Sequence, residues 1–398
     1  MRIESGHRLS TPRAGTAASV ARRRRKRRTL RLRRLAATAV LVALVPILYS
    51  YVSTMLQPSS VALGVRSVEW VRAHHGAWLV NDVERIYYSL NAPAKGGPPL
   101  LKLPTIGKAA AAGSKPASYR PPPMRPLVWP ALPGEGLWHS SGVNVRGAAP
   151  VLVTAIRPEP SYPRNLAYVA WIDHTRTQLA LYPGRYEPPS KLPRGPMSVP
   201  YSQRWRLLAT FNSGFAYRDS HGGFAVDGRS YKPLVRGMGT VVGYADGTVD
   251  VVAWHGGATP PPGVVVAKQN LPLIVNGGRP NPNLRDGPAW GATVGNAIRV
   301  WRSGLGIDRH GNLIYAAADY QTVSSLAALL IHAGAVRALQ LDINPTWPTF
   351  ITYTHSARLA ATKLFPTKHS ASRYLVPDDR DFFAIYRQAP GTTVVPGL

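Results

Sequence analysis

Residues 297–342 read AIRVWRSGLGIDRHGNLIYAAADYQTVSSLAALLIHAGAVRALQLD. Two apolar runs of strand length lie in the first half of this stretch, Ala297–Trp301 and Leu313–Ala317. Between them, an Asp-Arg-His-Gly-Asn sequence has the residue types of a turn. The first half therefore predicts two strands joined by a turn.

The second half predicts a helix and a further strand. Apolar residues in Ser324–His332 recur at helical spacing. Thr322 before them is of the N-capping type, and Gly334 after them can end the helix. Val336–Leu341 then reads as a buried strand.

Short β-type runs also recur on the N-terminal side of this stretch. They are Val151–Ile156, Leu166–Ile172, Gln178–Tyr182, Leu207–Phe211, Val241–Tyr244 and Val249–Trp254, the last two around an Ala-Asp-Gly-Thr turn. Many strands with few helices predict an α+β domain built on a twisted mixed sheet.

An uncharged segment of 22 residues, LAATAVLVALVPILYSYVSTML, occupies Leu35–Leu56. At 1.5 Å per residue, a helix of this length crosses about 30 Å of hydrocarbon. Tyr49 and Tyr51 lie near its end, where aromatic rings favour the membrane interface. We therefore predict a single transmembrane helix.

The charge before this segment predicts its orientation. Residues 1–34 hold 13 Lys and Arg against one acid, Glu4, and Arg22–Arg28 are seven consecutive bases. Positive residues stay on the cytoplasmic side, so residues 1–34 are expected to be cytoplasmic and the C-terminal domain extracytoplasmic, in the cell membrane. The arginine run is expected to contact anionic lipid headgroups. A cleaved signal peptide is the alternative, although no clear small-x-small site follows the apolar run.

The remaining boundaries follow from composition. Residues 57–91 carry apolar positions at helical spacing and predict a helical stalk. Residues 92–149 are rich in Pro, Gly and Ala and predict an extended linker without a core. The α+β domain then covers residues 150–388, and residues 389–398 form a C-terminal tail.

Composition excludes several kinds of chemistry. The chain has no Cys, so disulfides, thiolate metal sites and cysteine nucleophiles are ruled out. The 11 His form no metal-binding pattern, and no glycine motif follows a strand and opens a helix, so we expect no metal and no cofactor. Much of the net charge of +29 belongs to the N-terminal cluster. The domain does not interleave basic with aromatic residues, so we expect no nucleic-acid partner.

Three polar residues that follow apolar strands are the first site candidates. All six Glu precede residue 188, so carboxylate chemistry in the second half of the chain must use Asp. Asp342 ends a strand, where a rigid element can aim a side chain into a crevice; an Asx turn that closes the strand is the alternative. Asn212, in Asn-Ser-Gly-Phe, can bind sugar hydroxyls or simply form a turn. Arg302 can clamp a phosphate, or lie on the surface in a glycine turn.

Taken in order, these motifs resemble the phosphodiester glycosidase family. The matching blocks are Asn212-Ser213-Gly214-Phe215, Asn276-Gly277, Arg302-Ser303-Gly304-Leu305-Gly306-Ile307, a following helix, and Leu341-Asp342. The resemblance covers about residues 150–388 and rests on the order and spacing of the blocks. Where the family continues Leu-Asp-Gly-Gly-Gly-Ser, this chain has Ile343-Asn344-Pro345-Thr346 and lacks the glycine nest.

The resemblance implies a hydrolase of sugar phosphodiester or glycosidic bonds in envelope glycans. Asp342 would be the acid/base or nucleophile, and Asp319 the second carboxylate that glycoside cleavage commonly uses. Arg302 would offset the charge of a phosphate. The other residues expected to bind the glycan or sugar-phosphate substrate are Asn212, Gly214, Asn276, Gly277, Asn344 and Trp347.

A non-catalytic module that binds an anionic cell-wall polymer is the alternative function. The basic balance of the domain suits such a polymer equally well. In that case, Asp342 and Arg302 should not share a cleft.

Overall fold

The computed structural model describes residues 14–59, 61–107, 119–286, 288–291, 299–356 and 358–388. The predicted tail, residues 389–398, lies outside this range. The chain divides into two compact units, Met1–Gln57 and Pro58–Leu398.

The first unit is a single long helix, α1 (Ala14–Leu56). Within it, Arg22–Leu56 is long and apolar enough to cross a membrane, and its most apolar window is not buried against protein. The predicted apolar helix is therefore confirmed. A signal sequence shares this length and composition, so the membrane anchor and its orientation stay predictions.

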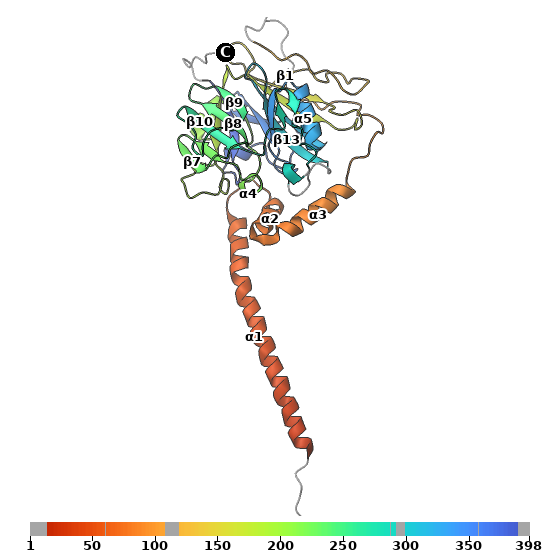
Figure 1. The fold of residues 1–398 in the computed structure, drawn as a ribbon, viewed down its shortest axis with the longest axis vertical. Coiled ribbons are helices and arrows are strands. Elements are labelled where there is room, and N and C mark those ends of the chain that lie inside the picture. The colour runs from red at the N-terminus through yellow and green to blue at the C-terminus, as the bar shows by residue number, and fades with distance from the viewer. Residues whose placement is uncertain are drawn as a thin grey trace, which may run out of the picture. The chain divides into compact units, whose positions relative to one another are not determined.

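The described strands all belong to the second unit and form three sheets (Figure 1). The eight-stranded sheet has the order β1 (His139–Ser140), β2 (Val151–Ile156), β3 (Ala167–Ile172), β14 (Leu313–Gln321), β13 (Val300–Ile307), β15 (Arg337–Gln340), β11 (Val275–Asn276) and β12 (Arg279–Pro280). One five-stranded sheet has the order β7 (Arg229–Lys232), β6 (Phe224–Val226), β10 (Val264–Gln269), β8 (Gly239–Tyr244) and β9 (Val249–Ala253). The other has the order β17 (Leu359–Lys363), β16 (Phe350–His355), β5 (Leu207–Asn212), β18 (Phe382–Arg387) and β4 (Thr177–Tyr182).

The α+β class with few helices is confirmed. The strand runs expected within the described residues are present, including the hairpin of β8 and β9. Residues 297 and 298 of the expected run Ala297–Trp301 lie outside the described residues, and β13 begins at Val300. Instead of one mixed sheet, the described strands form three sheets whose paired strands run antiparallel. Neighbours such as β13 and β14 are joined by a short turn, and such a connection can link only antiparallel strands.

Alternation along β13 explains how the large sheet packs on both faces. Leu305 and Ile307 point into the main core, which also contains Phe211 and Phe383 of the neighbouring sheet. Gly304 lies on the opposite face, where an added Cβ would be 2.8 Å from a methyl group of Leu330. The glycine thus permits the close approach of α5 (Val323–His332) to the sheet.

The sequence also specifies the ends of α5. The Thr322 side chain accepts the Ser325 backbone N–H, and the Ser325 hydroxyl accepts the Thr322 backbone N–H, which forms a capping box. After the helix, Gly334 has a φ of +100°, a conformation that favours glycine. Both predicted ends of this helix are confirmed.

The Pro-rich stretch differs from the extended linker expected from its composition. Met124 and Trp138 are buried in the cluster between the large sheet and α5. Glu135 forms a fully buried ion pair of 2.7 Å with Arg157 at the end of β2. Proline removes backbone donors but leaves neighbouring apolar side chains free to pack. The described residues 119–149 are therefore part of the folded unit, while the predicted domain boundaries stay predictions.

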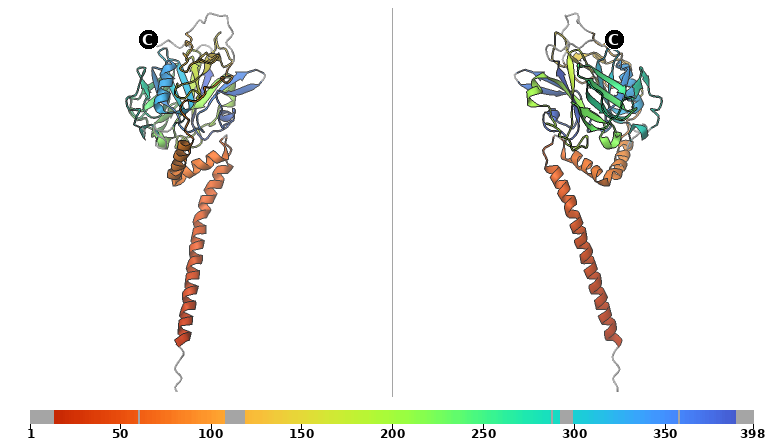
Figure 2. Two further views of the ribbon diagram at one scale, coloured as in Figure 1. Left: turned by 90° about the vertical axis from the view of Figure 1, so that its right-hand side faces the viewer. Right: turned by 60° about the vertical axis from the view of Figure 1, so that its left-hand side comes forward.

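Residues 57–91 have the helical character that was predicted. α2 (Leu63–Val71) and α3 (Ala77–Leu90) are joined by a kinked turn, Arg72–Gly76, where His75 has a φ of +65°. Both helices lie at one end of the strand region in the views of Figures 1 and 2. The remaining short helices are α4 (Tyr217–Ser220) and the 3-10 turns Tyr201–Arg206, Pro288–Trp290 and Arg373–Leu375.

Candidate functional site

A cavity of about 340 Å³ lies where the large sheet, α4 and the helices α2 and α3 meet. The turn after β15 supplies Asp342, Asn344 and Trp347 to its wall. Arg380 enters from the segment before β18. Segments distant in sequence thus bring acids, a base and an aromatic ring to one space, so we treat this cavity as the candidate site.

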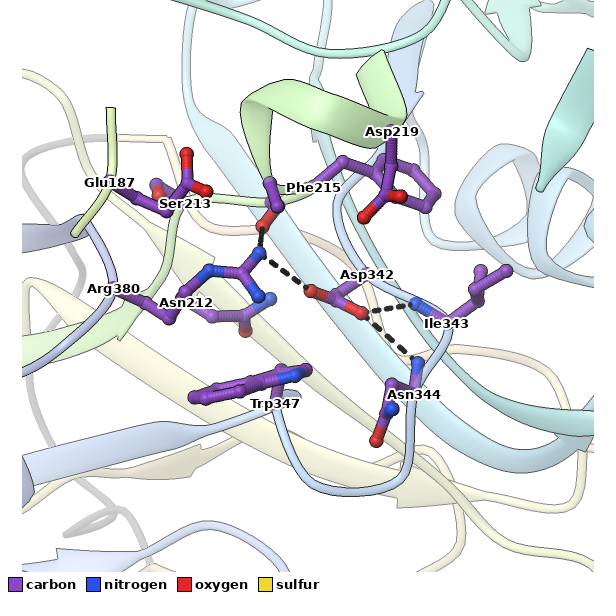
Figure 3. A network of polar contacts seen from close by, with 12 residues as sticks. Glu187, Asn212, Ser213, Phe215, Asp219, Asp342, Ile343, Asn344, Trp347 and Arg380 are labelled. Carbon is purple, nitrogen blue, oxygen red and sulfur yellow. Dashed lines mark hydrogen bonds and ion pairs between the residues drawn. The ribbon is translucent and has the colours of Figure 1, made fainter. Parts of the chain in front are cut away.

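Asp342 lies at the centre of the site (Figure 3). One carboxylate oxygen, Oδ1, accepts the backbone N–H groups of Ile343 at 2.8 Å and Asn344 at 3.0 Å. The other, Oδ2, is 3.4 Å from Nη2 of Arg380. The Asx turn considered from the sequence is therefore present, and the second oxygen remains directed to a cation in the cavity.

Burial changes the acidity of this carboxyl. The Asp342 residue is only 4% exposed. Burial raises its pKa to about 6, while the positive charge of Arg380 and the turn amides act in the opposite direction. The negative charge of Asp219 raises it further. A carboxyl with this pKa exchanges a proton near neutral pH, as acid–base catalysis requires.

Arg380 is the cation that faces Asp342 in the cavity. Its guanidinium donates to the backbone oxygen of Gly214 at 2.9 Å and lies 4.7 Å from the centre of the Trp347 ring. Burial lowers its pKa, but Asp342 and Glu187 raise it, with a net rise. Its Nε is buried and has no hydrogen-bond partner among the described residues. The guanidinium therefore stays charged and keeps an unused donor.

Further acids surround the cavity. Asp219 of α4 lies across from Asp342 in Figure 3. Glu69 of α2 pairs with Arg218 at 2.7 Å. Burial raises the pKa of Glu69, but the charges of Arg218, Arg380 and Arg72 lower it more.

The pKa of Glu84, the acid that α3 contributes to the cavity wall, shifts in the opposite direction to that of Glu69. Burial raises the pKa of Glu84, although Arg72 lies 2.5 Å away and opposes the rise. Arg72 also forms an ion pair of 2.9 Å with Glu69. This arginine, in the turn that connects α2 and α3, therefore binds one acid from each helix. Helices α2 and α3 thus contribute charged groups to the same cavity.

The side chain of Asn212 forms hydrogen bonds within the fold. Its amide donates to the Ser303 hydroxyl at 3.1 Å, and its oxygen accepts from the Tyr315 hydroxyl and the Thr349 backbone N–H. It does not line the cavity. Gly214, two residues on, has a φ of +125°, and an added Cβ would be 2.0 Å from Asn270. In the Asn212-Ser213-Gly214-Phe215 block, the backbone oxygen of Gly214 accepts a hydrogen bond from Arg380, and Phe215 lines the cavity.

Arg302 lies outside the cavity lining. It is fully buried and donates to the backbone oxygen of Gln321 and the side-chain oxygen of Gln340, both at 2.8 Å. Burial lowers its pKa to about 9. The prediction of a glycine turn here is wrong, because Gly304 lies within the continuous strand β13. Arg302 and Asp342 therefore do not share the cavity.

Of the other residues that were expected in the site, some line the cavity and others do not. Asp319 is in β14 and outside the cavity lining, although burial raises its pKa to about 6. Asn276 ends β11 and Gly277 begins the tight turn to β12, and both lie away from the lining. Asn344 and Trp347 do line it, beside Asp342.

Sequence reasoning missed Arg380. It lies in an Asp-Asp-Arg-Asp run, a composition that predicts a solvated polar cluster, but the acids of this run are buried. Asp378 and Asp381 are buried, the first against Arg373 at 2.8 Å and the second against Lys268 at 3.3 Å. The available signal was a dense charge cluster directly before the apolar strand Phe382–Arg387.

Within the described residues, no group of three or more His, Asp and Glu side chains is arranged to hold a metal ion. The acids around the cavity face arginines instead. The prediction of a metal-free site stays a prediction.

Comparison with known proteins gives distant structural similarities. No family model matches the chain, and no curated protein sequence matches it. The catalytic domain of zebrafish N-acetylglucosamine-1-phosphodiester alpha-N-acetylglucosaminidase, auto-inhibited by its pro-peptide, is 15% identical. The match covers 62% of this chain and 87% of that one, with a TM-score of 0.40. A hypothetical protein from Synechocystis is 13% identical over 62% of this chain and 64% of that one, with a TM-score of 0.38. These low values assign neither family nor activity to this chain.

Proposed function

We propose that this protein is a membrane-anchored, extracytoplasmic hydrolase of sugar phosphodiester or glycosidic bonds in envelope glycans. The observation that carries the proposal is the pair formed by Asp342 and Arg380 in one cavity. The pair combines a carboxyl whose pKa is raised to about 6 with a charged guanidinium 3.4 Å away. Proton transfer and anion binding are the two tasks that cleavage of a sugar phosphodiester requires.

The walls of the cavity suit a sugar. Trp347 offers an aromatic ring beside Arg380, and Phe215 lines the same space. Aromatic side chains pack against the apolar faces of ligands. Asn344 supplies an amide that can donate to and accept from hydroxyl groups. The volume of about 340 Å³ is at the lower end for small-molecule sites, so one sugar unit with its phosphate is a suitable size.

The chemical roles follow from these positions. A protonated Asp342 would donate to the leaving oxygen of a glycoside, and the resulting carboxylate would be stabilised by Arg380. Asp219 across the cavity replaces Asp319 as the candidate second carboxylate, because Asp319 lies outside the lining. A phosphate leaving group needs less protonation than an alcohol, so Asp342 alone can serve for phosphodiesters. Arg380 takes the role that was assigned to Arg302 from the sequence.

A non-catalytic module that binds an anionic polymer is the second candidate function. The observation in its favour is that Arg302 and Asp342 do not share a cleft, which was the arrangement expected for a binding module. The two turn amides on Asp342 Oδ1 also give this carboxylate a structural use.

Turnover separates the two functions. We expect the full chain, in detergent or nanodiscs, to hydrolyse aryl glycosides or sugar phosphodiesters. Asp342→Asn should abolish most of this turnover. Saturable binding of an anionic glycan without turnover, equal in wild type and Asp342→Asn, would contradict the hydrolase and support the binding module.

A further inference from the structure

Helix α3 has two faces of different character. One face lines the cavity through Ala77, Asn81, Glu84 and Tyr88. The opposite face consists of large apolar side chains that are exposed. They are Leu79, Val83, Ile86, Tyr87 and Leu90. At about 100° per residue, these two sets point to nearly opposite sides of the helix.

The apolar face is extensive for a protein surface. Exposure ranges from 49% for Leu79 to 80% for Leu90. A strip with Asp82, Arg85 and Ser89 borders it on one side, and Trp78, which is 68% exposed, lies within this strip. Contiguous apolar patches of this kind mark contact with a protein partner or a membrane. The face runs from the first turn of α3 to the last, so its occupant contacts the whole helix.

We propose that this face of α3 lies in the interfacial layer of a lipid bilayer. Tyr87 on this face and Trp78 at its border are exposed and have the amphipathic rings that favour the headgroup level. The face itself carries no charged side chain, as an apolar face immersed at the acyl boundary requires. In sequence, α3 follows the membrane-length helix after residues 57–76, so the chain brings it to the same bilayer if that helix is inserted.

The driving force is apolar burial rather than attraction to anionic lipid. The charged residues of α3 are Asp82, Glu84 and Arg85, which sum to a net negative charge. Contact should therefore occur with neutral phosphatidylcholine and persist at high salt. The cavity on the opposite side of α3 would then lie within about one helix diameter, roughly 10 Å, of the lipid surface. This inference does not depend on the chemistry of the cavity.

The absence of cysteine from the chain permits a direct test. Single variants Val83→Cys and Ile86→Cys are labelled with an environment-sensitive fluorophore in the full chain, reconstituted in phosphatidylcholine nanodiscs. Ser89→Cys on the polar strip and Arg309→Cys in the distant turn between β13 and β14 are the matched controls. Circular dichroism and thermal unfolding confirm that each labelled chain folds as the unlabelled one does.

We expect blue-shifted emission from the labels at positions 83 and 86, with strong quenching by doxyl-labelled lipid and protection from iodide. The label at position 89 should be quenched less by the lipid, and that at position 309 not at all. The proposal is overturned if labels 83 and 86 are as accessible to iodide as label 309. Protection without lipid quenching, but with energy transfer between two labelled chains, overturns it in favour of a second copy. Failure of the chain to remain in the nanodiscs also overturns it.

Discussion

The guanidinium of Arg380 lies 3.4 Å from the carboxylate of Asp342, across 38 positions of sequence. Asp342 follows β15 of the eight-stranded sheet, and Arg380 precedes β18 of a different sheet. The two therefore meet only when the two sheets pack. The site predictions below all test this relationship.

Asp342→Asn keeps the size of the side chain and removes its proton transfer. General acid–base help is typically worth about 10²–10⁴-fold, so we expect turnover to fall by that factor with folding intact. Asp319→Asn is the matched control, because its carboxyl also has a pKa raised to about 6 by burial but lies outside the cavity lining. An equal loss in both variants would restore Asp319 as the second catalytic carboxylate.

The same carboxyl predicts how stability depends on pH. Its folded-state pKa of about 6 lies above its usual value of 3.8, so the folded protein binds this proton more tightly than the unfolded chain. The free energy of unfolding should therefore fall as pH rises through this window, by on the order of 3 kcal/mol from this group. Denaturant unfolding at pH 4 to 7 should show this decline in wild type. Because Asp342→Asn removes the titration, a variant with the same pH profile would refute the assignment.

Arg380→Lys tests anion recognition. Lysine keeps the charge but loses the fork that binds two phosphate oxygens. We expect kcat/KM to fall more for sugar phosphodiesters than for neutral glycosides. Arg302→Lys is the control, since Arg302 is fully buried and lies outside the cavity lining. It should lower stability, by about 1–3 kcal/mol for the lost buried hydrogen bonds, and leave the preference between substrates unchanged. A change in substrate preference from Arg302→Lys would return that residue to the site.

Glu135→Gln tests whether the Pro-rich stretch belongs to the folded unit. The variant leaves the fully buried Arg157 without its counter-charge, which typically costs about 3–5 kcal/mol. Glu159→Gln is the control, because its ion pair with Arg299 is partly exposed and should contribute less than about 1 kcal/mol. Chemical denaturation of both variants gives the comparison. If the two lose equally little, residues 119–149 act as a linker after all.

The same ion pair changes the expectation for fragments. From composition, a fragment that starts near residue 140 should fold alone. The structure instead predicts a cooperative transition for residues 119–388 and a much weaker one for 140–388, which lacks Met124, Glu135 and Trp138. Thermal unfolding of both fragments decides between the two boundaries.

Topology is tested in intact cells. Because the bases precede the apolar segment, protease added outside should remove the C-terminal domain and spare the N-terminus. A protected domain would show that the predicted orientation is wrong.

The sequence by itself determined the local features of this protein. The uncharged Leu35–Leu56 segment predicts an apolar helix because a helix satisfies its own backbone hydrogen bonds. The strands around β13 and the capped helix α5 were also predictable, because turn residues, alternation and caps act over a few neighbouring positions. Asp342, Asn344 and Trp347 could be selected because they adjoin one such strand end.

Tertiary structure decided which of the candidates meet. Arg302 and Asp342 both accompany apolar strands, yet Arg302 is fully buried against Gln321 and Gln340 and does not reach the cavity. The role of Arg380 could not be recognised from the charge cluster in which it lies. Its burial depends on how β18 packs against a separate sheet. The Pro-rich stretch packs because Glu135 finds Arg157 across 22 positions. Such contacts depend on which surfaces are brought together after the local elements form, and no short sequence window contains both partners.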